Sequence, residues 1–221
     1  EDGEQELLLA DRRAFYAFEN DGGRCVFAAV RDPATGEAEP FLGTLLNTPG
    51  IIQARELEET HEDAVTRAPA LLDWWADRGG SLYVNADYRS EVRAGGWRLR
   101  SPDGRVEKVV TLRDGKLSVR YTLHPNLGTL YVRCGLTPAV LDLFLGGEQI
   151  QASRRSDGAR VARAKTKAGR TVEVALLPQS GATLIDNATF GTKGAMGVPF
   201  SYQVELSGTG TFGFEIQPAL R

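Results

Sequence analysis

The chain has 221 residues, of which 42% are hydrophobic and 25% are charged, and its formal net charge is −3 at pH 7. These proportions are ordinary for a globular protein with a sizeable core, and acidic and basic residues are interleaved along the sequence. The sequence has no basic block and no apolar run of about 18 residues, so it predicts neither nucleic-acid binding nor a membrane-spanning helix.

The N-terminal part of the chain predicts short strands joined by tight turns. After an acidic leader at residues 1–6, an apolar segment is broken by Asn-Asp-Gly-Gly at 20–23, and a second turn follows at 32–37. Asn, Asp and Gly favour hairpin turns because they tolerate a positive φ. The first residues are Glu-Asp-Gly rather than Met, which suggests a processed form or a piece of a longer chain.

One helix is predicted, over residues 60–78. Thr60 and Asp63 form a capping-box pattern at its start, and apolar residues then recur at helical spacing. A Gly-Gly pair follows the last residue and ends the helix. Pro69 lies inside the segment and predicts a kink or two shorter helices.

The rest of the chain predicts strand after strand, with frequent turns between them. The central stretch, 107–148, alternates apolar and polar residues around an Asp-Gly turn at 114–115 and a Pro-Asn-Leu-Gly break at 125–128. This alternation predicts an antiparallel β-meander with one buried face, on which Val109 and Thr111 begin the series. Further strands are predicted at 81–86, 88–94, 97–101, 149–153, 159–164, 170–177, 182–186, 200–207 and 211–217.

Short strands at this spacing predict an all-β, mainly antiparallel fold rather than βαβ units. We predict one domain over residues 1–221, a large two-sheet β-sandwich with a helical insertion around residues 60–78. The predicted core positions of its central strands are Val119, Tyr121, Leu130, Val132 and Leu141.

The central stretch also resembles a known family. The hairpin Asp-Gly-Lys-Leu-Ser-Val-Arg-Tyr-Thr-Leu at 114–123 and the segment Gly-Leu-Thr-Pro-Ala-Val-Leu-Asp-Leu-Phe-Leu-Gly-Gly at 135–147 resemble the central strands of galactose-mutarotase-like β-supersandwich domains. Residues 7–27 are similar to the opening hairpin of modules attached to sugar-processing enzymes. Such domains occur in aldose epimerases and as modules of glycoside hydrolases, so the resemblance implies a carbohydrate-associated supersandwich.

The resemblance also implies what catalysis would need. In aldose epimerases a histidine acts as general acid and a glutamate as general base on the concave face of the sandwich. This chain has two histidines and lacks the family's Asn-His-x-Tyr-Phe-Asn-Leu motif, so no catalytic residue can be carried over. The catalytic candidates that remain are His124, Glu205 and Glu215. A structural role is the alternative for His124, which precedes a turn proline, and an exposed strand face is the alternative for both glutamates.

Aromatic residues are candidates for sugar binding because flat rings stack on the apolar faces of pyranoses. Trp75 falls on the apolar stripe of the predicted helix and is assigned to the core, whereas Trp74 lies off that stripe. The candidate ligand-binding residues are Trp74, Trp97, Tyr88 and His61. The alternative for the aromatic residues is a place in the core, and for His61 a solvated helix start.

Cys25 and Cys134 both fall at inward-facing strand positions, which favours two buried apolar side chains and leaves a disulfide open. Neither has a metal-type spacing to a second cysteine or to a histidine, so no metal site is predicted. The sequence has no phosphate-binding loop, dinucleotide fingerprint or nucleophile elbow, and no cofactor is predicted.

These observations favour an accessory role over catalysis by the chain on its own. We predict a non-catalytic, carbohydrate-associated domain that packs on or shapes the catalytic domain of a larger carbohydrate-active enzyme, in the same protein or in a partner chain. Two alternatives stay open: an aldose epimerase or mutarotase, and an assembly β-domain without sugar contact. A carbohydrate is the expected ligand, and the sequence is compatible with secretion and with a cytoplasmic location.

Overall fold

A sandwich of two antiparallel β-sheets makes up the described part of the chain. The computed structural model describes residues 6–32, 34–43, 70–75, 83–84, 86–136, 140–149, 159–166, 169–186 and 203–219. These residues contain no helix, and therefore none that is long and apolar enough to cross a membrane. The predicted two-sheet, all-β architecture is confirmed.

The first sheet has eight strands in the order β1-β2-β3-β5-β10-β16-β15, and β4 pairs with β3 on the same edge as β5. Its strands are β1 (Leu7–Ala10), β2 (Ala14–Phe18), β3 (Cys25–Arg31), β4 (Ala38–Gly43), β5 (Ala70–Trp75), β10 (Leu130–Gly135), β15 (Thr183–Asp186) and β16 (Gln203–Gly208).

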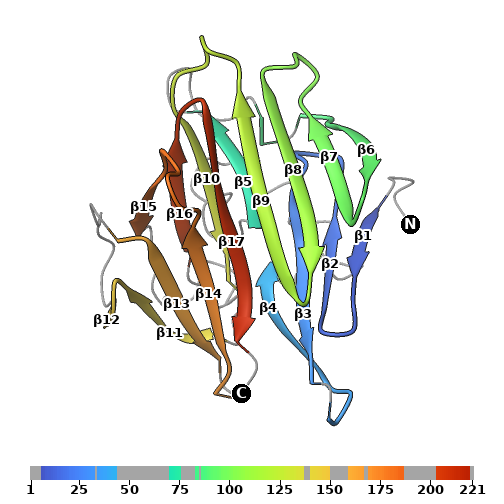
Figure 1. Cartoon of the computed structure of the whole chain (residues 1–221), viewed down its shortest axis with the longest axis vertical. Helices are drawn as coiled ribbons and strands as arrows, with labels where there is room; N and C mark the ends of the chain where they lie inside the picture. Colours follow the sequence, from blue (N-terminus) through green and yellow to red (C-terminus); the bar gives the residue numbers. More distant parts are fainter. Residues whose placement is uncertain are drawn as a thin grey trace, which may run out of the picture.

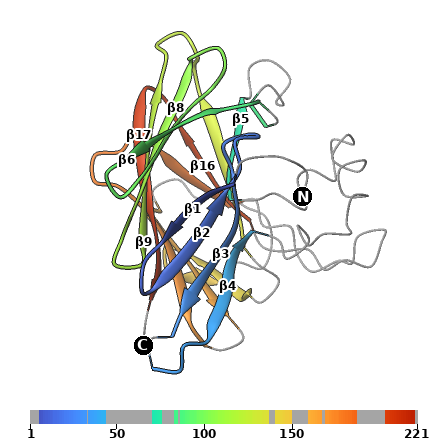
Figure 2. The same ribbon diagram turned by 90° about the vertical axis from the view of Figure 1, so that its right-hand side faces the viewer.

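The second sheet has nine strands in the order β12-β11-β13-β14-β17-β9-β8-β7-β6 and lies in front of the first in Figure 1. Figure 2 shows the side of the molecule, with β6, β8, β9 and β17 in one layer and β1 to β4 in the other. The strands of the second sheet are β6 (Arg89–Arg93), β7 (Gly96–Arg100), β8 (Val106–Arg113), β9 (Lys116–Leu123), β11 (Val140–Leu145), β12 (Glu148–Gln149), β13 (Val161–Thr166), β14 (Thr171–Leu176) and β17 (Thr211–Ala219).

The core lies between the two sheets, where the inward-facing residues of both sheets meet. Val119, Tyr121, Leu130 and Val132 are completely buried, as the period of two in the sequence predicts. The prediction for Leu141 concerns a side chain outside the described part. The central strands therefore supply the core from both sheets at once.

The Asp-Gly turn between β8 and β9 is confirmed as a two-residue hairpin. Arg113 pairs with Lys116, and Asp114 and Gly115 have φ values of 52° and 81°. Positive φ at both central residues is the geometry that suits the twist of a hairpin. The carboxylate of Asp11 accepts a hydrogen bond of 2.7 Å from the backbone N–H of Gly115, which ties the hairpin to the other sheet.

The predicted meander is correct for β8 and β9 and wrong for the strand that follows them. β9 pairs with β8 on one edge and with β17 on the other, so it has no edge left for β10. The turn at 125–128 instead carries the chain across to the eight-stranded sheet, where β10 pairs with β5 and β16. Alternation in sequence cannot distinguish a hairpin from such a crossover, because both leave one buried face.

The phase of β8 is also corrected by one residue. Val106, Lys108 and Val110 point into the core, whereas the predicted series of Val109 and Thr111 lies on the half-buried outer side. The cause is Lys108, a charged residue at a completely buried position, which makes the core-facing side of this strand look polar in the sequence.

The helix predicted over residues 60–78 is wrong in the part that can be compared. Its described part, Ala70–Trp75, is strand β5, and the rest of it lies outside the described residues. Apolar residues occupy both faces of this strand, and a short apolar run cannot be assigned to helix or strand by periodicity alone. Tyr83 and Val84, in the strand predicted at 81–86, lie in a turn.

The two cysteines are completely buried and free. Cys25 of β3 and Cys134 of β10 both pair with Ala70, on opposite sides of β5. Two strand spacings place their Cα atoms about 10 Å apart, beyond the roughly 7 Å that a disulfide spans. Burial raises the pKa of both thiols, that of Cys134 to about 12, so they act as small apolar side chains.

Candidate functional site

The outer face of the eight-stranded sheet, which points away from the nine-stranded sheet, carries a polar and aromatic cluster. Along β10, Leu130 and Val132 belong to the core, whereas Tyr131 and Arg133 alternate with them and lie on the outer face. Strand register places Trp74 opposite Tyr131 on one side and Glu205 opposite Arg133 on the other. We define the outer-face cluster as Trp74, Tyr131, Arg133, Glu205 and Ser207.

Arg133 is the centre of this cluster. Its Nε donates a hydrogen bond of 2.6 Å to Oε2 of Glu205, and its guanidinium carbon lies 4.3 Å from the centre of the Trp74 ring. Arg133 and Glu205 are 9% and 7% exposed. A charge-assisted hydrogen bond and a cation–π contact thus hold the guanidinium in place, and the two opposite charges neutralise each other.

One donor of the cluster has no acceptor among the described residues. The Nη1 atom of Arg133 is buried and makes no hydrogen bond within the described part of the chain. A buried donor without a partner costs about 1–3 kcal/mol, so most such groups in folded proteins are paired. The outer-face cluster therefore contains one buried donor beside a tryptophan ring that no described acceptor satisfies.

A buried ion pair lies on the other side of β5, in the core. Asp73 accepts hydrogen bonds from Nζ of Lys108 at 2.9 Å and from the hydroxyls of Tyr88 and Tyr121, each at 2.7 Å. The side chains of Asp73 and Lys108 have no exposed surface. No ligand in solution can reach these groups, so this cluster serves the fold rather than catalysis.

The lysine of this pair has further hydrogen-bond acceptors. Nζ of Lys108 also donates to the carbonyl oxygens of Gly22 at 3.1 Å and Leu71 at 3.0 Å. Three acceptors match the three donors of an ammonium group. Burial lowers the pKa of Lys108 and Asp73 opposes that change. Burial, followed by the charge of Asp73, raises the pKa of both tyrosines well above the usual value, so their hydroxyls remain donors.

Two glycines allow Lys108 to reach this position. Gly22 and Gly23, in the Asn-Asp-Gly-Gly turn between β2 and β3, have φ values of 64° and 53°. A Cβ on Gly22 would lie 2.3 Å from the carbonyl oxygen of Val84, and one on Gly23 would lie 2.8 Å from Cε of Lys108. The turn therefore requires glycine for its conformation and for the close packing of the lysine.

The structure brings together two residues that the sequence offers separately. Trp74, a predicted ligand-binding residue, and Glu205, a predicted catalytic residue, both contact Arg133. Sequence reasoning missed Arg133, although its alternation with Val132 places it on the face opposite to the core. Its two partners come from strands far away in the sequence, and only the sheet order reveals them.

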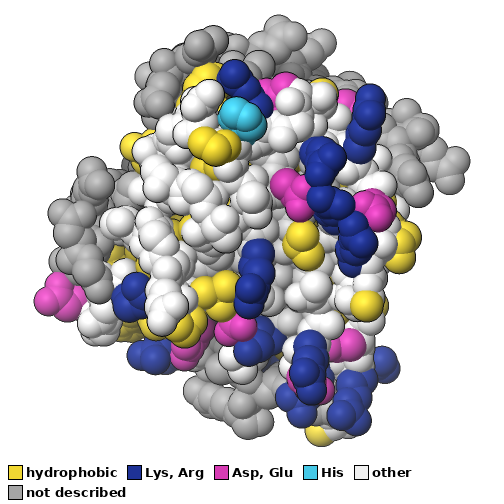
Figure 3. Space-filling view, turned by 45° about the horizontal axis from the view of Figure 1, so that its top comes forward, with side chains coloured by type: hydrophobic (Ala, Val, Ile, Leu, Met, Phe, Trp, Pro, Cys, Tyr) yellow, Lys and Arg dark blue, Asp and Glu magenta, His cyan; other side chains and the backbone are white. Residues whose placement is uncertain are grey.

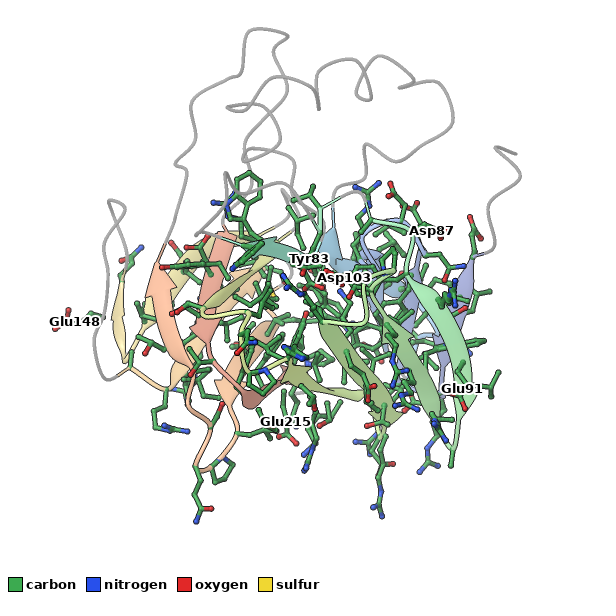
Figure 4. All side chains as sticks on the ribbon, turned by 90° about the horizontal axis from the view of Figure 1, so that it is seen from above. Tyr83, Asp87, Glu91, Asp103, Glu148 and Glu215 are labelled. Atoms are coloured by element: carbon green, nitrogen blue, oxygen red, sulfur yellow. The ribbon has the colours of Figure 1, made fainter. Side chains whose placement is uncertain are left out.

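The other catalytic candidates lie elsewhere. His124 is exposed after the end of β9, and its Nδ1 accepts a hydrogen bond of 3.4 Å from the backbone N–H of Asn126. Glu215 lies on β17, where Nζ of Lys116 donates to its Oε2 at 3.1 Å. Figure 4 shows Glu215 on the far side of the nine-stranded sheet, pointing away from the sandwich. Neither residue joins Glu205.

The remaining ligand-binding candidates are also dispersed. Tyr88 is completely buried at Asp73. Nε1 of Trp97 lies 3.4 Å from the carbonyl oxygen of Leu8, where the edges of the two sheets meet. His61 lies outside the described residues. Of the four candidates, Trp74 alone joins the outer-face cluster among the residues that can be compared.

The outer face of the nine-stranded sheet carries charges of both signs. Nη2 atoms of Arg98 and Arg100 donate to the same oxygen of Glu107, at 2.6 and 2.9 Å. Figure 3 shows basic and acidic side chains next to one another over this side of the molecule. Exposed pairs of this kind contribute little stability each. Within the described ranges, no group of three His, Cys, Asp or Glu residues is arranged to hold a metal ion.

Comparison with known proteins identifies the fold. No protein-family model matches the sequence, and no curated protein is similar to it. An aldose epimerase homologue from C. elegans is similar in structure, with a TM-score of 0.54 and 12% identity over 97% of this chain and 98% of that one. The chain thus has a galactose-mutarotase-like sandwich fold.

Two larger structures contain the same fold. A 4-alpha-glucanotransferase from Thermococcus litoralis is similar in structure, with a TM-score of 0.56 and 14% identity. The match covers 100% of this chain and 40% of the glucanotransferase chain. A heparan sulfate lyase from Pedobacter heparinus is also similar, with a TM-score of 0.58 and 12% identity. The match covers 98% of this chain and 35% of the lyase chain. In these two proteins the matching part is less than half of the chain.

Proposed function

We propose that this chain is an accessory, carbohydrate-associated domain that binds a neutral saccharide at its outer-face cluster. The observation that carries the proposal is the unpaired Nη1 donor of Arg133, held next to the ring of Trp74. The similar structures support the carbohydrate association, because an aldose epimerase homologue, a glucanotransferase and a heparan sulfate lyase share the fold.

The chemistry of the cluster favours a neutral sugar over an acidic one. A tryptophan ring offers an apolar surface to the C–H face of a pyranose, and a guanidinium N–H donates to a hydroxyl oxygen. The charge of Arg133 is already neutralised by Glu205 at 2.6 Å. A carboxylate or sulfate ligand would gain little attraction from this pair and would be repelled by Glu205.

The positions of the catalytic candidates favour binding over catalysis. An epimerase needs an acid and a base within about 3 Å of the same sugar. Glu205 pairs with Arg133, three residues into β10 and about 10 Å from the start of that strand. His124 follows β9 in the other sheet, and its described hydrogen bond joins it to Asn126 rather than to Glu205, which supports binding over catalysis.

The accessory role also rests on the larger neighbours. In the glucanotransferase and the lyase the same fold makes up 40% and 35% of the chain, which supports a module that packs on or shapes a catalytic domain. An aldose epimerase is the second candidate function, because the epimerase homologue is matched over 98% of its length.

Saccharide titrations test the binding site. We expect the chain to bind at least one of three neutral oligosaccharides, maltoheptaose, cellohexaose or xylohexaose. Isothermal titration calorimetry measures this binding. Trp74→Ala and Arg133→Met should each weaken that binding about tenfold or more, equivalent to roughly 1.4 kcal/mol, since both remove a central contact.

The matched control is Glu215→Gln, which breaks the ion pair with Lys116 on the opposite side of the molecule. It should bind the oligosaccharide like the parent chain, and a heparin oligosaccharide should not bind either protein. The proposal would be contradicted if the chain bound the heparin oligosaccharide and none of the neutral ones. It would also be contradicted if Glu215→Gln and Arg133→Met lost the same amount of affinity for the neutral oligosaccharide.

A further inference from the structure

We propose that the buried Asp73–Lys108 pair is a positioning device that sets Trp74 over Arg133. Asp73 directly precedes Trp74 on β5, and the two side chains point to opposite faces of the sheet. The inference goes beyond the proposed function, because it concerns how the outer-face cluster is held whether or not a sugar binds there.

The strand pairing of β5 is irregular in its described part. Among the described residues, one pair is formed on its β3 side, Cys25 with Ala70. On its β10 side the register runs from Trp75 to Ala70 but shifts between Arg133 and Cys134. The pairing of β5 with β10 is thus interrupted at one point, where contacts with the facing sheet can help to set the direction of its side chains.

The irregularity is a bulge at Leu71. Arg133 pairs with Leu72 and Cys134 pairs with Ala70, so Leu71 has no opposite residue. Its φ is 61°, in the left-handed region that bulky side chains rarely adopt and that persists only where neighbouring contacts enforce it. Bulges re-aim the side chains beside them, and this one lies three residues before Trp74.

Lys108 supplies one such contact, from the facing sheet. Its Nζ donates to the carbonyl oxygen of Leu71 at 3.0 Å and to Asp73 at 2.9 Å. One ammonium group therefore holds β5 at two points, the bulge and the residue before Trp74. Tyr121, also from the nine-stranded sheet, holds the other oxygen of Asp73 at 2.7 Å.

Buried charged pairs are often not needed for the stability of a fold. A buried ion pair that is replaced by apolar side chains of similar size often leaves a protein equally stable, whereas the loss of one partner is damaging. A positioning role therefore predicts that replacement of both partners preserves the fold but disturbs the contact between Trp74 and Arg133.

The test is the Nε–H resonance of Arg133 in ¹H–¹⁵N NMR spectra of the sugar-free protein. In the parent chain we expect this proton to exchange slowly with solvent, because it is hydrogen-bonded to Glu205. We also expect the ring of Trp74 to shift its resonance. The variant Trp74→Phe gives the chemical shift of the same proton without the indole ring. The double variant Asp73→Leu/Lys108→Met should still fold and unfold cooperatively. Its Arg133 Nε–H resonance should lose most of the ring-current shift, and this proton should exchange with solvent about tenfold faster than in the parent chain.

Asp73→Asn/Lys108→Met provides a second double variant that keeps hydrogen bonds to the tyrosines. Tyr88→Phe is the control, because it removes one hydrogen bond and leaves the pair and the Leu71 contact; its Nε–H resonance should match that of the parent. A folded double variant with an unchanged Arg133 resonance overturns the proposal. If neither double variant folds, the pair is a stability element and the proposal is wrong.

The result is independent of sugar binding. The resonance is measured in the free protein, so a failure to find a saccharide ligand leaves this test unaffected. Conversely, an unchanged resonance in a folded double variant would leave the outer-face cluster intact as a candidate binding site.

Discussion

Lys108→Met should lower the free energy of unfolding by about 3–5 kcal/mol, because it leaves the carboxylate of Asp73 buried without its counter-charge. Asp73 has no exposed surface, and the two tyrosine hydroxyls that remain cannot replace a positive charge. A loss of this size is a large part of the roughly 5–15 kcal/mol that stabilises a typical domain. Urea denaturation followed by circular dichroism measures it.

Lys116→Met is the matched control for that experiment. Lys116 also pairs with a carboxylate, Glu215 at 3.1 Å, but the two side chains are 39% and 29% exposed. Water screens such a pair, so the expected loss is at most about 1 kcal/mol. Equal effects of the two lysine variants would contradict the buried character of the Asp73–Lys108 pair.

Val132→Asp should abolish folding altogether. Val132 is completely buried at the centre of β10, and its cross-strand neighbour on β5 is Asp73. The new carboxylate would lie about 5 Å from the Asp73 position on the same face, where burial and like charge both oppose ionisation. We expect no soluble protein with a cooperative unfolding transition.

Val132→Thr separates the effect of charge from that of shape. Threonine has nearly the shape of valine and adds one hydroxyl, so this variant should fold with reduced stability. A soluble Val132→Asp protein that melts as cooperatively as the parent would mean that β10 does not lie in the core between the sheets.

The sequence predicts the strands better than it predicts their partners. The Asp-Gly turn at 114–115 specifies its own hairpin, because the conformation of two residues decides it. The turn at 125–128 gives no such information, because whether β10 returns to β9 depends on β17, which pairs with β9 from almost a hundred residues away. Ala70–Trp75 suffers from the same problem, since an apolar strand between two others has no alternation.

The site is hidden for a related reason. Trp74 and Glu205 can each be selected by residue type, but their grouping depends on Arg133 and on the order β5-β10-β16. Lys108 is harder still, because a lysine on a core-facing position is read as a polar, solvent-facing residue. Asp73, which makes its burial possible, belongs to the other sheet.

Polarimetry tests the central claim, that the chain binds sugar without transforming it. Freshly dissolved α-anomers of glucose and galactose should mutarotate at the buffer rate in the presence of the chain, and His124→Ala should leave that rate unchanged. The opposite result is a rate that rises in proportion to protein concentration and collapses in Glu205→Gln or His124→Ala. That outcome would identify an epimerase and contradict the accessory role.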